Sequence, residues 1–158
     1  MEGRLSARPR LDGLLTGLPL VPGIASVGVL YGAASVDAGI PPWTVVTTTL
    51  LVATGTAQWV ALDLLSRDVA WWTIVLVGLA INLRFAVYSL HIGPWVSRWP
   101  AWRRLAYCSL LTDEGYALSM ARRADADIDR RSFLRWSTSL AAVVWGAWLV
   151  GTGCGALT

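Results

Sequence analysis

Long stretches without a charged side chain dominate this sequence. No Asp, Glu, Lys or Arg occurs in three runs of 24, 25 and 23 residues, Gly13–Val36, Ala38–Leu62 and Trp136–Thr158. An α-helix needs about 20 apolar residues to cross a bilayer. Only 15% of the residues are charged, against about 25% in soluble domains. The sequence therefore predicts an all-α integral membrane protein rather than a soluble or disordered chain.

The apolar runs and turn signals predict about five transmembrane helices, over residues 13–36, 43–65, 69–90, 102–121 and 133–153. Residues 1–12 are expected to be a cytoplasmic segment before a single transmembrane domain, 13–158. Some helices should be broken, because Pro19 and Pro22 interrupt the first and Gly55 permits irregular backbone in the second. Gly28 and Gly32 form a small-residue pair that favours close helix packing.

The distribution of arginine predicts the orientation of these helices. All 13 basic residues are arginine, and a cytoplasmic N-terminus places nine of them on the inner side and three outside, as the positive-inside rule favours. The inner nine are Arg4, Arg8, Arg10, Arg67, Arg122, Arg123, Arg130, Arg131 and Arg135. The outer three, Arg98, Arg103 and Arg104, fit poorly unless their loop re-enters the membrane or a span is broken. Because the arginines form no basic face, nucleic acid is not an expected partner.

Polar residues within the second and third predicted spans are candidates for function. Thr54, Thr56 and Gln58 supply hydrogen-bonding groups deep in the second span, and they could serve as interhelical contacts or as substrate ligands. Arg84 lies within the third span, where an arginine costs about 2.5–3.5 kcal/mol on insertion scales. It must therefore face protein or water and find a partner. Tyr88 lies one turn further along the same face.

Asp113 and Glu114 fall at the centre of the fourth predicted span, about 100° apart around the helix. We expect Arg84 to form a salt bridge with one of them, directly or through one water, while the other lines a cavity or carries a proton. The alternative is a purely structural pair, but buried ion pairs contribute little net stability. His91, the single histidine, lies at the predicted membrane edge and is either an interfacial residue or a proton relay.

No motif for enzymatic chemistry is visible in the sequence. There is no phosphate-binding loop, no cluster with metal-ligand spacing and no Ser–His–Asp set. We therefore expect no enzymatic activity, no metal, no cofactor and no primary active transport by this chain. Cys108 and Cys154 are expected to be free thiols in the membrane.

Four segments resemble the AzlC family, the large subunits of branched-chain amino-acid exporters. They are DGLLTGLPLVPG at 12–23, TGTAQWVAL at 54–62, INLRFAVYSL at 81–90 and LLTDEGYAL at 110–118. Phe85 stands where the family usually has histidine. The family's chains are usually longer, with further spans, so the resemblance implies a short or C-terminally truncated member.

The resemblance implies a multi-pass permease subunit in a bacterial plasma (inner) membrane, which exports branched-chain or similar apolar amino acids with a small hydrophobic subunit of the AzlD type. The functional residues that it implies by motif position are Gln58, Asn82, Arg84, Asp113 and Glu114. A zwitterionic amino acid needs a cation for its carboxylate and an anion or carbonyl groups for its ammonium, which agrees with these residue types. The alternatives are a non-transporting scaffold that binds a partner and a half-transporter that needs a second chain. A second copy of the chain, in a homo-oligomer, is a further candidate partner.

Overall fold

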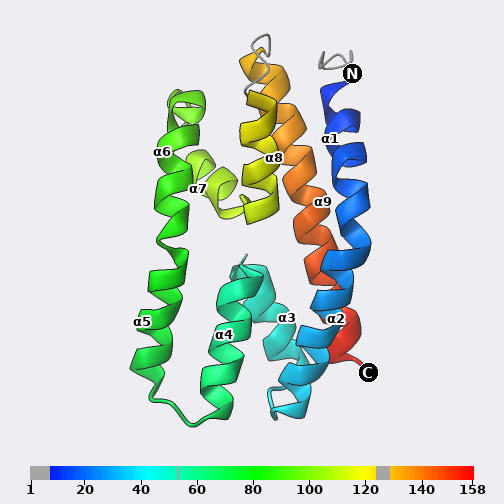
Figure 1. Cartoon of the computed structure of the whole chain (residues 1–158), viewed down its shortest axis with the longest axis vertical. Helices are drawn as coiled ribbons and strands as arrows, with labels where there is room; N and C mark the ends of the chain where they lie inside the picture. The colour runs from blue at the N-terminus through cyan, green and yellow to red at the C-terminus, as the bar shows by residue number, and fades with distance from the viewer. Residues whose placement is uncertain (1–7, 53, 124–128) are drawn as a thin grey trace. The chain divides into compact units, whose positions relative to one another are not determined.

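The computed structural model describes residues 8–52, 54–123 and 129–158, and every regular element within these ranges is helical (Figure 1). The elements are α1 (Pro9–Gly17), the 3₁₀ turn η1 (Leu18–Leu20), α2 (Val21–Asp37), α3 (Pro42–Leu51), α4 (Gly55–Ser66), α5 (Trp71–Asn82), α6 (Arg84–Val96), α7 (Ala101–Ser109), α8 (Asp113–Arg123) and α9 (Arg130–Ala156). The prediction of an all-α membrane protein is confirmed. Arg4 and most of the polar loop predicted between Arg122 and Arg131 lie outside the described residues.

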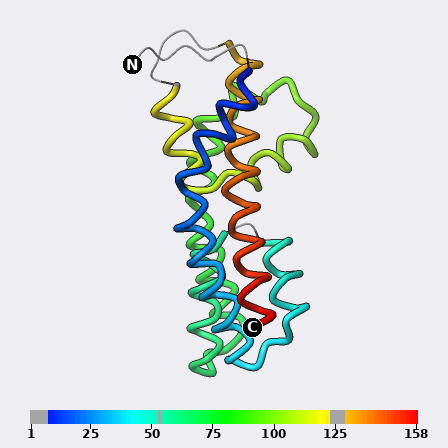
Figure 2. The backbone as a smooth tube through the Cα atoms, turned by 90° about the vertical axis from the view of Figure 1, so that its right-hand side faces the viewer, coloured from blue at the N-terminus to red at the C-terminus, as the bar shows by residue number. Residues whose placement is uncertain are grey.

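Three stretches of helix are long and apolar enough to cross a membrane within the described ranges, namely Pro9–Asp37, Trp71–Val96 and Arg130–Ala156. The first already begins at Pro9, within the segment that the sequence predicts to precede it. Its prolines interrupt the α-helical hydrogen bonding for one turn, as predicted, without ending the helical stretch: Pro19 lies in η1, and Pro22 lies at the start of α2. Proline has no backbone N–H to donate, and a short 3₁₀ turn tolerates the loss of that hydrogen bond. Helix α9 is a single unbroken rod (Figure 2).

The second predicted span is a helical hairpin instead of one crossing. Helix α3 ends at Leu51, the backbone is extended at Val52 (φ −113°, ψ 90°) and at Thr54 (φ −141°, ψ 102°), and α4 then begins at Gly55. Figure 1 shows α4 running back in the direction opposite to α3. The second predicted span thus divides into two short helices at its Thr-Gly-Thr segment.

Contacts between α3 and α4 establish that they run antiparallel. Thr49 accepts a hydrogen bond from Gln58 (Oγ1···Nε2, 3.3 Å), and Val45 and Leu62 are buried in one apolar cluster. In each pair, the two residues are equally far along the chain from the point between residues 53 and 54. This symmetry is what two antiparallel helices joined at that point produce. The two ends of the hairpin, Pro42 and Ser66, therefore lie at the same end of it.

The fourth predicted span is also a hairpin. Helix α7 ends at Ser109 and α8 begins at Asp113, and Figure 1 shows the two running in opposite directions. The Thr112 hydroxyl accepts the Gly115 amide at 3.2 Å, which caps the start of α8. Asp113 and Glu114 thus occupy the first turn of α8 instead of the centre of a continuous span, and negative charge is favourable there. In the described residues, three long helices and two hairpins stand in place of the five continuous helices that the sequence predicts.

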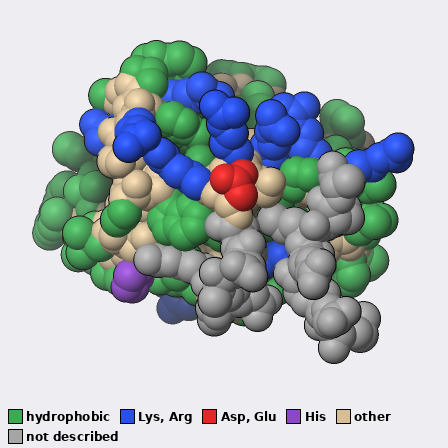
Figure 3. Space-filling view, turned by 90° about the horizontal axis from the view of Figure 1, so that it is seen from above, with side chains coloured by type: hydrophobic (Ala, Val, Ile, Leu, Met, Phe, Trp, Pro, Cys, Tyr) green, Lys and Arg blue, Asp and Glu red, His purple; other side chains and the backbone are tan. Residues whose placement is uncertain are grey.

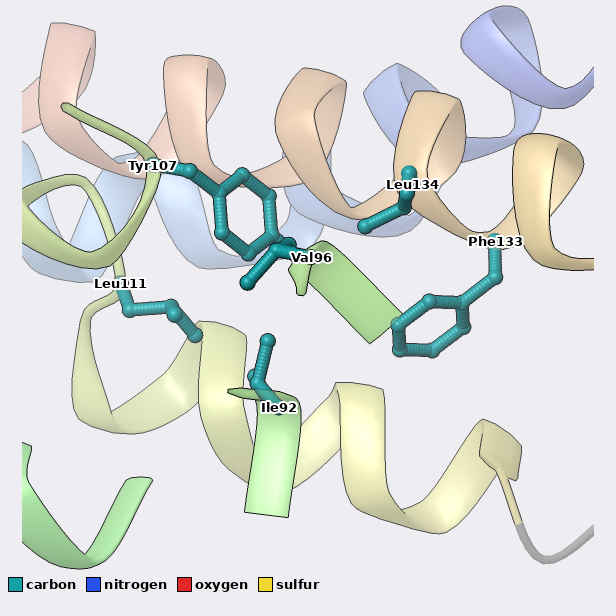
Figure 4. Close-up of a cluster of buried hydrophobic side chains, with 6 residues drawn as sticks. All are labelled: Ile92, Val96, Tyr107, Leu111, Phe133 and Leu134. Atoms are coloured by element: carbon teal, nitrogen blue, oxygen red, sulfur yellow. The ribbon is translucent and has the colours of Figure 1, made fainter. Parts of the chain in front are cut away.

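The chain divides into two compact units, which are described separately. The first unit comprises Met1–Val21 and Tyr88–Trp145, and the second comprises Pro22–Val87 and Gly146–Thr158. The core of the first unit joins α6, the α7–α8 hairpin and α9 (Figure 4). The buried side chains of this cluster are Ile92, Val96, Tyr107, Leu111, Phe133 and Leu134. The core of the second unit contains Tyr31, Val45, Leu62, Trp148 and Ala156.

Glycines let the helices of the second unit approach closely. A Cβ atom at Gly32 would overlap the carbonyl oxygen of Thr152 on α9, and one at Gly155 would overlap the carbonyl oxygen of Val29 on α2. Gly28 is similarly close to α9, because a Cβ atom there would lie 2.9 Å from the carbonyl oxygen of Trp148. The close packing predicted for Gly28 and Gly32 is therefore present between α2 and α9.

Candidate functional site

The first cluster of polar residues lies in the second unit, at the tip of the α3–α4 hairpin. Arg84, the first residue of α6, donates from Nη2 to the Thr54 hydroxyl over 3.2 Å. Thr54 is buried and forms the extended residue immediately before α4. The Arg84 guanidinium also lies 5.4 Å from the centre of the Phe85 ring. Arg84 thus faces protein, as the cost of placing it in lipid requires.

Gln58 is held by other protein groups. Its Oε1 accepts the Trp148 indole N–H at 2.9 Å, and its Nε2 donates to the Thr49 hydroxyl at 3.3 Å. The side chain is 5% exposed, so these bonds join α3, α4 and α9 in a dry environment. Of the two roles left open by the sequence, this geometry supports the interhelical contact.

Two further predicted residues of the second unit lie in different environments. Thr56 is exposed. Asn82, the last residue of α5, has a buried Oδ1 atom without a hydrogen-bond partner in the described residues. Buried amide oxygens are normally paired, so Asn82 Oδ1 keeps an unused capacity to accept a hydrogen bond.

The second cluster lies in the first unit, between α6 and the start of α8. Tyr88 donates from its hydroxyl to Oδ1 of Asp113 at 2.7 Å. The rings of Tyr88 and Tyr116 stack with their centres 3.9 Å apart, and the Tyr116 hydroxyl lies 2.5 Å from Nδ1 of His91. The structure therefore joins two predicted residues, Tyr88 and Asp113, whereas the predicted Glu114 is exposed.

The salt bridge expected between Arg84 and Asp113 or Glu114 concerns two separate units and stays a prediction. Sequence reasoning overlooked Trp148, although its place away from the ends of the fifth predicted span argues against simple anchoring at the interface. It also left out Tyr116, which follows Asp113 at the i+3 spacing that brings helical side chains together. No group of three or more His, Cys, Asp or Glu side chains in the described ranges is arranged to hold a metal ion.

Comparison with known protein families identifies the lineage of this chain. A family model described as AzlC protein matches residues 19–158, a range that includes both hairpins and every predicted site residue. The chain belongs to the AzlC family. AzlC membership makes it a membrane protein related to branched-chain amino-acid transport, from a family that works with a small partner subunit. No curated protein and no solved structure matches the chain significantly.

Proposed function

We propose that this chain is a permease subunit of a bacterial inner membrane, which exports branched-chain or similar apolar amino acids with a small hydrophobic AzlD-type subunit. The observation that carries the proposal is the Arg84 guanidinium bound to Thr54 at the tip of a helical hairpin. Discontinuous helices of this kind expose backbone groups to a substrate within the membrane. A chain that only bound a partner would gain little from an arginine at such a place.

The chemistry of a zwitterionic amino acid fits the residues around Arg84. The guanidinium would receive the substrate carboxylate, and a hydrogen bond to a charged group is worth about 1.5–3 kcal/mol. The amino-terminal end of α4, at Gly55, adds positive potential for the same carboxylate. The unpaired Oδ1 of Asn82 can accept from the substrate ammonium. Asp113, in the first unit, is the candidate for carrying a coupled proton.

We further propose that the N-terminus is cytoplasmic. Each hairpin returns the chain to the side from which it entered, so only the three long helices cross the membrane. A cytoplasmic N-terminus then places eleven arginines inside, leaves Arg67 alone outside and keeps Arg84 within a span. The eleven are Arg4, Arg8, Arg10, Arg98, Arg103, Arg104, Arg122, Arg123, Arg130, Arg131 and Arg135. This distribution follows the positive-inside rule better than five crossings, which leave three arginines outside.

The test of the proposed function is the substitution Arg84→Ala, with the partner subunit co-expressed. Cells are loaded with a valine- or leucine-containing dipeptide, and the intracellular amino acid is followed over time. We expect the variant to reach the membrane in normal amounts and to lose export, because the substrate carboxylate loses its cation.

The matched control is Arg67→Gln. Arg67 is an exposed arginine whose Nη2 lies 2.9 Å from Oδ1 of Asp63, and that hydrogen bond and charge raise its pKa above the ordinary value. Exposed pairs of this kind contribute little, so export should persist. If the wild-type chain with its partner lowers no amino-acid pool, it is a scaffold. If Arg84→Ala exports normally, the site is elsewhere.

A further inference from the structure

Two helices of the first unit bring three arginines to one cavity. Helix α1 packs tightly on α9 at Gly13, where a Cβ atom would overlap the carbonyl oxygen of Trp136. Arg10 lies one turn before Gly13, and Arg135 directly precedes Trp136. A cavity of about 480 Å³ is lined by Arg8, Pro9, Arg10, Leu11 and Arg135.

The charge at this cavity is positive. Arg8, Arg10 and Arg135 are all exposed, and Figure 3 shows arginine side chains gathered around one acidic patch on this end of the first unit. Among the described residues that line the cavity, three are arginines and none is acidic, while Asp12 lies one turn after Arg8 along α1. Guanidinium forks bind phosphate oxygens in pairs, so the cavity favours a phosphate-bearing ligand.

An apolar stripe starts at the same cavity and continues along α1. Leu11, Leu14, Leu15 and Leu18 are 44%, 41%, 54% and 54% exposed, and their spacing places them on one face of the helix. Leu11 also lines the cavity. A free phosphate ion would use the arginines alone, whereas a phospholipid would use the arginines for its phosphate and the stripe for an acyl chain.

We propose that this cavity binds the headgroup phosphate of an anionic glycerophospholipid in the adjacent leaflet, with one acyl chain lying along Leu11, Leu14, Leu15 and Leu18. The positive cavity, at the N-terminal end of α1, attracts a charged headgroup. The leucine stripe that continues from it contacts an acyl chain, so the site favours a charged lipid. Basic pockets between membrane helices are suited to such headgroups. This site shares no residue with the transport site proposed around Arg84.

The test uses the purified full-length chain in a neutral detergent and measures binding of fluorescent phosphatidylglycerol, with phosphatidylcholine and inorganic phosphate as competitors. We expect phosphatidylglycerol to bind more tightly than phosphatidylcholine. The double variant Arg10→Gln/Arg135→Gln should weaken phosphatidylglycerol binding by about tenfold. Inorganic phosphate at millimolar concentration should displace little of the lipid.

The matched control is Arg98→Gln/Arg104→Gln, which removes the same charge from exposed positions of the first unit that do not line the cavity. Its affinity for phosphatidylglycerol should stay within about twofold of wild type. Equal weakening by the two double variants would overturn the proposal in favour of diffuse attraction. Efficient displacement by inorganic phosphate, or equal binding of phosphatidylcholine, would also overturn it. Thermal melting of each variant establishes that the fold is retained.

Discussion

Gln58 connects three helices through one buried amide. Replacement by alanine leaves the Trp148 indole N–H and the Thr49 hydroxyl without their partner, although Thr49 keeps its bond to the Val45 carbonyl at 2.8 Å. A buried group left unsatisfied costs about 1–3 kcal/mol. We therefore expect Gln58→Ala to lower the melting temperature in detergent while reducing export less than Arg84→Ala does.

The comparison variant is Gln58→Glu, which retains an oxygen for the Trp148 N–H. It should lose less stability than Gln58→Ala if the indole contact dominates. An unchanged melting temperature for Gln58→Ala, measured by intrinsic tryptophan fluorescence, would show that the amide does not stabilise the second unit.

At the residue scale, the sequence predicts that Arg84 needs a partner but does not predict which residue provides it. The cost of an arginine in lipid required Arg84 to face protein, and the structure provides Thr54 as one partner. The bond between Trp148 and Gln58 spans 90 residues, so only the packing of α9 against the hairpin brings these two side chains together. The sequence around either residue gives no indication that these two side chains are in contact.

The hydropathy pattern of the sequence predicted the long helices, but it did not distinguish the two hairpins from continuous helices. A charge-free run of 25 residues, Ala38–Leu62, is long enough for one crossing, but it also satisfies two short helices that pack on each other. The residues before the second helix of each hairpin differ in chemistry. Thr112 caps α8 by accepting the Gly115 amide, whereas Thr54 stands before Gly55 in an extended conformation without a capping hydrogen bond from its side chain. In sequence-based prediction, such signals at the start of a helix are weaker than the signal of a long apolar run.

Glycine spacing sets the contact between α2 and α9. The substitution Gly32→Ala places a methyl group against the backbone of α9 at Thr152. Neither backbone can yield without moving a whole helix, so we expect a loss of about 1–3 kcal/mol in stability and a lower melting temperature of the purified chain.

Gly153 provides the control for this packing effect. It lies on α9, and a Cβ atom there has no neighbour within 4 Å. Gly153→Ala should be neutral or stabilising, because alanine favours helix by about 1 kcal/mol over glycine. A similar loss in both variants would mean that α9 tolerates no change in this stretch, and the close contact at Gly32 would not be the cause.

At the scale of the whole molecule, the number of crossings can be tested directly by labelling single cysteines. In a chain with Cys108→Ser and Cys154→Ser, cysteine is placed at Ser66, Ser97 or Arg131, all between or near the ends of the long helices. A membrane-impermeant maleimide applied to intact cells should label position 66 and leave 97 and 131 unlabelled until the membrane is opened.

This pattern separates the alternatives, because five crossings with a cytoplasmic N-terminus would expose position 97 and protect 66 and 131. Labelling at 66 and 131 together, with 97 protected, would indicate five crossings in the inverted orientation. Labelling at 97 and 131 with 66 protected would reverse the orientation proposed for three crossings.

A long helix followed by a hairpin occurs twice along the chain, first as α1–α2 with α3–α4 and then as α5–α6 with α7–α8. In the three-crossing topology proposed above, each such module would carry the chain across the bilayer once, and the second module would start on the opposite side of the membrane from the first. The two faces of the membrane would then border equivalent modules of a long helix and a hairpin. In such a transporter, substrate can enter from either face of the membrane. The direction of net transport then follows the concentrations of substrate and coupling ion on the two sides.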